Sequence, residues 1–232
     1  MHYKLYSKDD LVEKANTTFT WIYKEKEDFY KLSSKHIEFW QTRWFQYTLN
    51  SYGFRCNDFS TYNKPTLAVL GCSHTFGTGL PIEKTWCWIV AQNLGLQLVN
   101  LGVPGGGLDT CSRVAKFWLP KIQPQITIVQ IPELFRREFL TEQGFSLKGV
   151  WDESFANFGI DNLNEPENNF NYEKNLDLIR YHSPCTVIPF NCHEIVLGTF
   201  LEQDGYLPAR DGRHWGIERH NLLAEQILSN LK

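Results

Sequence analysis

The feature that most constrains the fold is an alternation of strand and helix patterns that begins at Pro65. Short apolar runs predict four buried strands, at 66–70, 96–101, 126–131 and 185–190. Apolar residues at helical spacing predict helices at 82–94, 108–119 (ended by Pro120), 172–181 and 217–231. Strands alternating with helices of this length need crossover connections, so the pattern predicts an α/β fold with a mostly parallel sheet. The polar, Asn-rich stretch 141–171 carries no clear pattern.

The first 64 residues have a different texture from the rest of the chain. Charged residues are mixed with Trp, Tyr and Phe, one helix is predicted over 28–46, and Asn50–Gly53 indicates a turn. Aromatic residues make up 15% of the whole chain, which fits either an aromatic core or a surface that contacts sugar or lipid. We expect 1–64 to be an aromatic-rich extension packed on a main domain at 65–232, as a lid, an oligomer contact or simple packing.

Composition and targeting patterns exclude several classes of protein. Hydrophobic residues at 42% and charged residues at 21% are ordinary for a globular protein, and a net charge of −3 argues against a dedicated nucleic-acid binder. No apolar run approaches the roughly 18 to 20 residues of a membrane helix. The N-terminus lacks the apolar core of a secretion signal, so we expect a cytoplasmic protein with reduced cysteines.

Metal-binding patterns are weak. The six cysteines form no CxxC pair and no HExxH motif occurs, which argues against a zinc or thioredoxin-type site. The adjacent Cys192 and His193 are a remote candidate for metal contact.

In a parallel sheet, ligands bind beyond the carboxyl ends of the strands, which directs attention to the loops after 70, 101, 131 and 190. The first of these loops, Gly71–Gly77, is a small-residue turn that would raise Ser73 to the sheet edge and aim backbone N–H groups at the same point. It differs from the G-x-S-x-G nucleophile elbow because Thr75 replaces the last glycine. A plain strand-to-helix turn is the alternative.

Two further segments carry chemistry. The loop after the second strand contains Gly105–Gly107, which would allow close backbone approach and offer an N–H to negative charge, although a flexible turn also explains it. Its glycines complete no phosphate-binding motif. Before the last helix, Asp211 and His214 are three residues apart, so the carboxylate can hold the imidazole while the other ring nitrogen takes a proton. The alternative is an N-cap Asp with an incidental His.

Taken together, Gly-x-Ser-x-Thr at the start of the sheet, the Gly-rich second loop and Asp-x-x-His before the last helix resemble the SGNH hydrolases, also called GDSL esterases or lipases. The resemblance covers about 65–232, and the segment 50–55 is similar to a lead-in of some bacterial and phage members, which would fit a phage-encoded origin. It implies a three-layer α/β/α, flavodoxin-like fold. It also implies a hydrolase acting on carboxylic esters without metal or cofactor.

The resemblance assigns roles to individual residues. Ser73 would be the nucleophile, His214 the general base and Asp211 its orienting carboxylate. The N–H groups of Ser73 and Gly105 would form the oxyanion hole, with Gly102 or Gly106 replacing Gly105 if the register shifts. The expected substrate is a small acyl ester, with O-acetyl groups on carbohydrate as the first candidate.

Two positions depart from the family pattern. Cys72 stands where the family has Asp, which affects hydrogen bonds within the loop more than the chemistry. Leu134 stands where the third family block has an Asn oxyanion donor. Losing one such donor typically costs on the order of 10²- to 10³-fold in kcat, which weakens an esterase without abolishing it. Gln130 or Arg136 are candidates to replace it.

Three alternatives remain open at this stage. The same site could transfer an acyl group to a sugar hydroxyl, or the chain could be a non-catalytic glycan-binding module on a decayed hydrolase. A flavodoxin-like nucleotide-binding protein would explain the alternation and the glycine loop, but not Asp211 together with His214.

The arginine pairs 136/137 and 210/213 could contact an anionic substrate, but salt bridges or solvation are the commoner roles.

Overall fold

The computed structural model describes residues 14–142, 144–149, 152, 155, 165–191 and 206–231. Within these residues, no helix is both long and apolar enough to cross a membrane. The candidate pair Cys192 and His193 lies outside the described residues.

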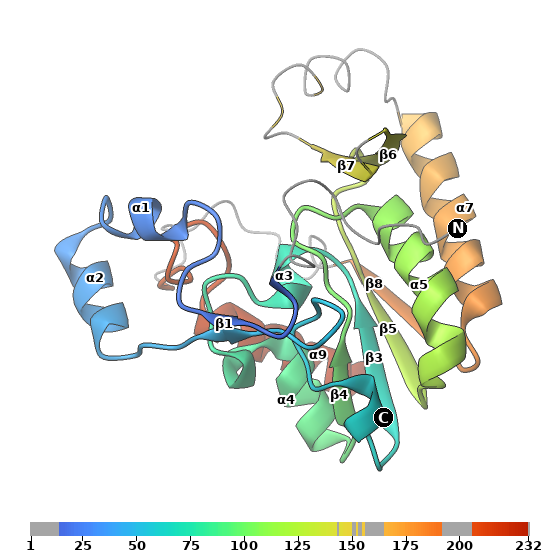
Figure 1. Ribbon diagram of the computed structural model, residues 1–232, viewed down its shortest axis with the longest axis horizontal. Helices are drawn as coiled ribbons and strands as arrows, with labels where there is room; N and C mark the ends of the chain where they lie inside the picture. Colours follow the sequence, from blue (N-terminus) through green and yellow to red (C-terminus); the bar gives the residue numbers. More distant parts are fainter. Residues whose placement is uncertain are drawn as a thin grey trace.

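A four-stranded parallel sheet forms the centre of the molecule (Figure 1). Its order is β4 (Gln97–Asn100), β3 (Thr66–Leu70), β5 (Ile126–Ile131) and β8 (Val187–Asn191). All three pairings are parallel, with Leu67 opposite both Leu98 and Ile126. Every residue of β3 is buried, and after Thr66 the strand is continuously apolar rather than alternating, as expected for a strand covered on both faces. The predicted parallel sheet is confirmed.

Helices cover both faces of this sheet, which gives the expected three layers (Figure 1). On one face lie α4 (Trp86–Asn93) and α9 (Ile217–Asn230), which enclose an apolar core with Leu67, Val69 and Ile128. On the other face lie α5 (Leu108–Ile122) and α7 (Glu165–His182), around Ala68 and Leu70. Alternate residues of β3 therefore serve opposite cores.

Several boundaries differ from the sequence prediction. Pro120 does not end its helix: α5 continues to Ile122, and Gln123 closes it in the left-handed conformation with φ 51°. Proline has no N–H, so at position 120 it removes one backbone hydrogen bond, the one to the carbonyl of Lys116. Lys116 is exposed, and the helix continues for two more residues. The predicted helix 82–94 is a 3₁₀ turn, η3 (Ile82–Lys84), followed by α4, because the Thr85 hydroxyl caps α4.

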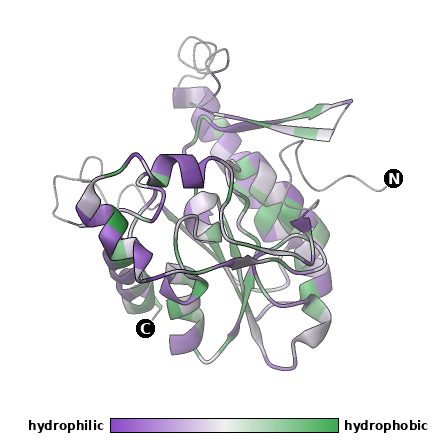
Figure 2. Ribbon diagram, turned by 60° about the vertical axis from the view of Figure 1, so that its left-hand side comes forward, coloured by the Kyte–Doolittle hydropathy of each residue, from purple (hydrophilic) through white to green (hydrophobic). Residues whose placement is uncertain are grey.

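The stretch without a clear pattern contains part of an antiparallel hairpin. Strands β6 (Arg137–Thr141) and β7 (Gly144–Lys148) pair with each other and stand away from the main sheet (Figures 1 and 2). Every residue of β7 is partly exposed, so neither face of this strand is fully buried. A strand of this kind needs no alternation of apolar and polar residues, and the hairpin was therefore not predicted from the sequence.

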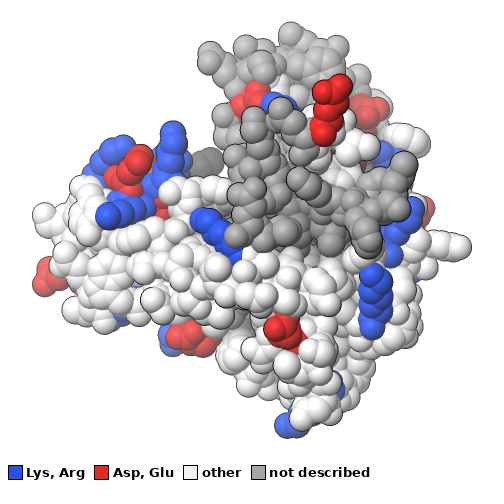
Figure 3. Space-filling view, in the orientation of Figure 1, with Lys and Arg blue, Asp and Glu red and all other residues white. Residues whose placement is uncertain are grey.

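The N-terminal segment does not form one helix over 28–46, as predicted. It contains β1 (Thr18–Phe19), α1 (Glu25–Phe29), α2 (Ser34–Gln41), β2 (Tyr47–Thr48) and the 3₁₀ turn η2 (Phe59–Thr61). The break arises because the Ser33 hydroxyl accepts from the His36 N–H and starts a new helix. Strands β1 and β2 pair antiparallel. Figure 3 shows charges of both signs mixed over the end of the molecule formed by α1 and α2.

The N-terminal segment packs on the loops at the carboxyl edge of the sheet. Phe29 and Trp40 share a buried cluster with Leu80 and Ala209, and Tyr47 stacks on Phe76. Phe54 belongs to the core under α5. The division of the chain at residue 65 stays a prediction.

His220 links the two helices α4 and α9 and makes stability depend on pH. It is buried, and its Nδ1 accepts the N–H of Trp86 at 3.0 Å. Burial, together with the nearby charges of His214 and Arg55, lowers the pKa of His220 to about 3, so the folded protein keeps it neutral while the unfolded chain protonates near 6.5.

We therefore expect His220 to lower the free energy of unfolding by about 2 kcal/mol as the pH falls from 7.5 to 5. The measurement is urea unfolding of the wild type and of His220→Gln at both pH values. The variant should lose about 2 kcal/mol less than the wild type over this range. Equal losses in the two proteins would contradict the assignment.

Candidate active site

Ser73 begins a short helix directly after the first strand of the domain. The helix α3 (Ser73–Phe76) follows β3 through Gly71 and Cys72, and the Cys72 carbonyl accepts the N–H groups of Thr75 and Phe76. Ser73 is buried to 7% exposure. Among the described residues, no hydrogen bond uses its backbone N–H. This N–H is therefore not engaged by any of the described residues, and its predicted role stays a prediction.

Two buried amides hold this turn from behind. Gln130 accepts the Thr75 hydroxyl at 2.6 Å, and its Nε2 lies 3.5 Å from the Cys72 sulfur. Asn100 donates to the Thr75 carbonyl at 2.9 Å and accepts the Gly102 N–H at 3.0 Å. Gln130 therefore fixes the shape of the turn. Asn100 ties the turn to the glycine loop.

Gly71 shows why the turn needs a small residue. Its φ is 156°, and a Cβ there would lie 2.2 Å from the Thr75 hydroxyl oxygen. A side chain at this position would therefore break the contact between Thr75 and Gln130.

Three glycines of the loop after β4 are candidates for the second backbone N–H of the predicted oxyanion hole, and their hydrogen bonds distinguish them. The N–H of Gly102 is bonded to Asn100, and that of Gly106 to the Val103 carbonyl at 2.9 Å. The N–H of Gly105 takes part in no hydrogen bond of the described residues. Gly105 also has φ 77°, a conformation that favours glycine. Of the three glycines considered, Gly105 is thus the one with an available N–H.

Asp211 and His214 meet in one turn before α9. His214 Nδ1 lies 2.5 Å from Asp211 Oδ2, while Asp211 Oδ1 accepts the backbone N–H groups of Arg213 and His214, both at 3.1 Å. Burial alone would raise the pKa of Asp211, but the charge of His214 and these hydrogen bonds hold it below its ordinary value. The Asp211 side chain is 7% exposed and that of His214 is 23% exposed. The carboxylate is thus ionised and covered, and the imidazole remains accessible.

The structure brings the Asp211–His214 loop against the Ser73 turn. The ring of His74, the residue after Ser73, lies 5.2 Å from the His214 ring and stacks on Trp215 at 3.9 Å. A Cβ on Gly79 would lie 3.1 Å from Asp211 Oδ1, so the loop after α3 also touches the carboxylate. No hydrogen bond of the described residues joins Ser73 Oγ to His214. The predicted residues share one edge of the sheet, and their catalytic roles stay a prediction.

Leu134, which stands where the resembled family has an Asn, also lies at this edge of the sheet. Leu134 is half-buried and packs on the core under α5. Arg136 Nη1 lies 3.4 Å from the Gly106 carbonyl and pairs with Glu133. Of the two replacement donors considered, Gln130 is occupied behind the turn, whereas Arg136 reaches the glycine loop. Arg137 pairs with Glu167, so both Arg136 and Arg137 form salt bridges within the protein.

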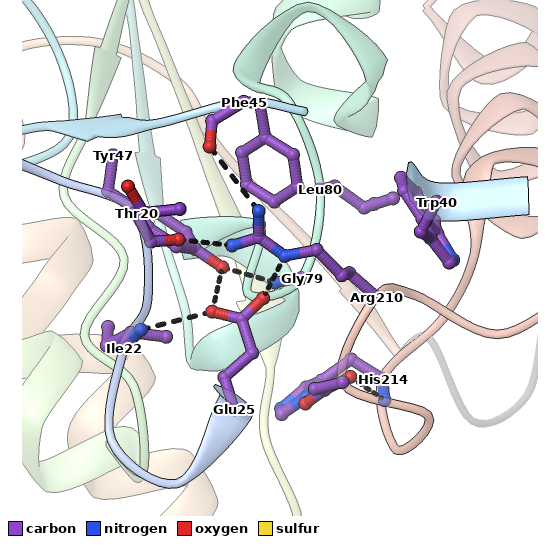
Figure 4. Close-up of polar contacts among 12 residues, drawn as sticks. Thr20, Ile22, Glu25, Trp40, Phe45, Tyr47, Gly79, Leu80, Arg210 and His214 are labelled. Atoms are coloured by element: carbon purple, nitrogen blue, oxygen red, sulfur yellow. Dashed lines mark hydrogen bonds and ion pairs between the residues drawn. The ribbon is translucent and has the colours of Figure 1, made fainter. Parts of the chain in front are cut away.

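The feature that sequence reasoning missed is a buried ion pair next to Asp211 (Figure 4). Arg210 Nε binds Glu25 Oε1 at 2.7 Å, and the two side chains are 0% and 1% exposed. The guanidinium also binds the carbonyls of Thr20 and Phe45, and lies 3.8 Å from the centre of the Phe45 ring. The position of Arg210 is thus determined by three parts of the N-terminal segment.

The other oxygen of Glu25 extends this network to the loop after α3. Glu25 Oε2 accepts the Ile22 N–H at 3.1 Å and the Tyr47 hydroxyl at 3.0 Å, and that hydroxyl accepts the Gly79 N–H at 2.7 Å (Figure 4). Burial raises the pKa of Tyr47, and the charge of Glu25 raises it further. The network therefore joins the loop after α3, the helix that Ser73 begins, to the loop that carries Asp211.

Further contacts hold the N-terminal segment on the Asp211–His214 loop. His36 Nε2 lies 3.3 Å from the Arg210 carbonyl, and Trp40 Nε1 donates to the Pro208 carbonyl at 3.2 Å. Arg213 pairs with Asp28 at 2.9 Å. The only sequence signal for these contacts was the high aromatic content of 1–64, which indicated packing without naming partners.

No metal site is found in the described part of the chain. Among the described residues, no group of three or more His, Cys, Asp or Glu side chains is placed to hold an ion.

Comparisons with known proteins give structural neighbours only. No protein-family model matches the chain, and no curated protein matches it. Among solved structures, the chain is similar to TesA at 15% identity and a TM-score of 0.49, over 72% of this chain and 98% of that one. It is also similar to a lipolytic protein of the G-D-S-L family from Desulfitobacterium hafniense DCB-2 at 12% identity and a TM-score of 0.39, over 70% and 97%.

A third neighbour is an acetyl xylan esterase, Est2A, from the rumen bacterium Butyrivibrio proteoclasticus. It shares 13% identity at a TM-score of 0.44, over 74% of this chain and 64% of that one. The neighbours thus include lipolytic proteins and a carbohydrate esterase.

We predict that Glu25→Gln lowers the free energy of unfolding by about 3 to 5 kcal/mol, because it leaves Arg210 buried without its carboxylate. The measurement is urea unfolding at pH 7. As a matched control, Asp177→Asn breaks the exposed pair with Arg180 and should change stability by less than about 0.5 kcal/mol. A loss in Glu25→Gln as small as that of the control would show that the buried pair does not hold the loop.

Proposed function

We propose that this protein is a serine hydrolase that cleaves small acyl esters through an acyl-Ser73 intermediate. The observation that carries the proposal is the hydrogen bond between His214 Nδ1 and Asp211 Oδ2, in a loop that lies against the residue after Ser73. A carboxylate that accepts from Nδ1–H selects the tautomer in which Nε2 can take a proton. The accessible edge of His214 is then the edge that would act as the base.

In the first half-reaction, Ser73 Oγ attacks the ester carbonyl and its proton passes to His214 Nε2. The new Oγ–C bond forms as the carbonyl electron pair moves onto oxygen, and the N–H groups of Ser73 and Gly105 stabilise the resulting oxyanion. When the C=O bond re-forms, the ester C–O bond breaks. The alcohol leaves with the proton from His214.

In the second half-reaction, water attacks the acyl group and His214 removes one of its protons. The tetrahedral intermediate collapses, the Oγ–C bond breaks, and Ser73 regains a proton from His214. The acid is released. Asp211 stays ionised throughout and stabilises the imidazolium each time it forms.

An acyl ester on carbohydrate is the substrate class that the surroundings of the loop favour. Trp44 and Tyr30 are more than half exposed, and both contact Trp21, whose ring lies 4.2 Å from the Arg210 guanidinium. These rings therefore lie on the segment that covers the Asp211–His214 loop. Flat amphipathic rings suit the C–H face of a sugar.

We expect Ser73→Ala to lower the rate of p-nitrophenyl acetate hydrolysis by more than about 10³-fold, because the nucleophile is lost. Ser229→Ala, at an exposed serine near the end of α9, should keep wild-type activity. A fluorophosphonate should label the wild type and not Ser73→Ala. A folded wild type that neither hydrolyses the ester nor accepts the label would favour the glycan-binding module. Acyl transfer is tested by adding an alcohol and measuring how the acyl group divides between the free acid and the new ester.

We expect Leu134→Asn to raise kcat on the same ester by about tenfold or more, because it returns a side-chain donor to the third block. Leu134→Ala is the matched control, since it removes the same side chain without adding a donor. An equal effect of both substitutions would show that this position does not face the oxyanion.

A further inference from the structure

A cavity with a volume of about 460 Å³ lies apart from the Ser73 site. Its walls come from residues 46–64 of the N-terminal segment and from residues 82–98, which include α4 and the edge strand β4 at the lower centre of Figure 1. None of its lining residues belongs to the Ser73 turn, the glycine loop or the Asp211–His214 loop. The volume falls within the roughly 300–1,000 Å³ of small-molecule sites.

The polar groups of this cavity are amides and indole rather than carboxylates. Gln46, Gln92 and Trp88 line it, and among the described residues no hydrogen bond uses their side chains. Tyr62 donates its hydroxyl to the Leu98 carbonyl at 2.7 Å, which fixes its ring in the wall. Amides both donate and accept, as sugar hydroxyls do, and the aromatic rings offer a flat apolar surface.

The cavity also has a positive charge without a matching carboxylate. Arg55 lines it and is 2% exposed, yet none of the ion pairs among the described residues includes it. Its guanidinium binds the carbonyls of Phe76, Gly77 and Leu80, at 3.2, 2.7 and 2.7 Å. These contacts use three of the five N–H groups that an arginine carries.

The surroundings of Arg55 leave this charge in excess. Burial lowers the pKa of Arg55 to about 10, so it is a cation at neutral pH. Glu25 already pairs with Arg210 and accepts the Tyr47 hydroxyl, and neither Glu25 nor Glu83 forms an ion pair with Arg55 among the described residues. The exposed Lys64 adds a second cation to the wall, and no Asp or Glu is among the lining residues.

We propose that this cavity binds a carboxylate-bearing saccharide of the hexuronate class. The carboxylate lies on the side of Arg55 and Lys64, and the ring packs on Trp88 with its hydroxyls on the amides. A neutral sugar would leave the two cations unmatched, and a small inorganic anion would leave the amides and rings unused. The site goes beyond the proposed hydrolysis because it involves no residue of the Ser73 site.

The test is a titration of the ¹⁵N-labelled protein with D-glucuronate, followed at the indole N–H of Trp88, which Trp88→Phe assigns. We expect saturable binding at least about tenfold tighter than that of D-glucose or of acetate. Glucose binding as tightly as glucuronate would overturn the role of the cations. Acetate binding as tightly would overturn the saccharide, and no saturable shift would overturn the site.

Rim variants keep the test independent of folding, because Arg55 also holds the backbone near Ser73. Lys64→Gln and Gln92→Ala should each weaken glucuronate binding about threefold or more. Lys116→Gln, at an exposed lysine on α5, is the matched control and should leave it unchanged. Ser73→Ala should also bind glucuronate as the wild type does, so the outcome is separate from that of the esterase. Binding that is equal in both rim variants and the wild type would place the ligand elsewhere and overturn the proposal.

Discussion

The buried pair of Glu25 and Arg210 is the contact on which the arrangement of the candidate site depends. Removing two charges from water costs more than their attraction returns unless their remaining hydrogen-bonding groups are satisfied. Here both oxygens of Glu25 have partners, and the Arg210 guanidinium binds two carbonyls besides the carboxylate. Such a pair tolerates few alternative positions. Because Asp211 is the next residue, the pair determines where the Asp211–His214 turn lies.

The N-terminal segment thus acts as a support that reaches both halves of the site. Arg55 binds the carbonyls that follow Ser73, and Glu25 binds the arginine that precedes Asp211. Tyr47 joins them, since its ring lies 4.5 Å from the Arg55 guanidinium and its hydroxyl binds Glu25. A shift of this segment would therefore move the two loops relative to each other. This role differs from that of a lid, which would leave both loops in place when it opens.

How much could be predicted from sequence depended on the distance between interacting residues. The parallel sheet followed from local apolar runs, and Asp211 with His214 followed from a spacing within one turn. The helix over 28–46 was wrong because a single cap at Ser33 interrupts a continuous apolar pattern. The partners of Arg210 were beyond prediction because Glu25 lies 185 residues away. Asn100 is a buried polar residue that follows the apolar Leu98 and Val99 at the carboxyl end of β4, which is the signal that could have indicated its role.

That separation also bears on the order in which the molecule assembles. A contact between residues 25 and 210 closes almost the whole chain into a loop, and such contacts form late because the closure entropy must be offset by structure already present. During synthesis, the segment 14–64 leaves the ribosome long before Arg210 exists. Until then, Glu25 lacks the guanidinium with which it pairs. The Ser73 turn can thus fold early, whereas the complete site forms only when the last part of the chain arrives.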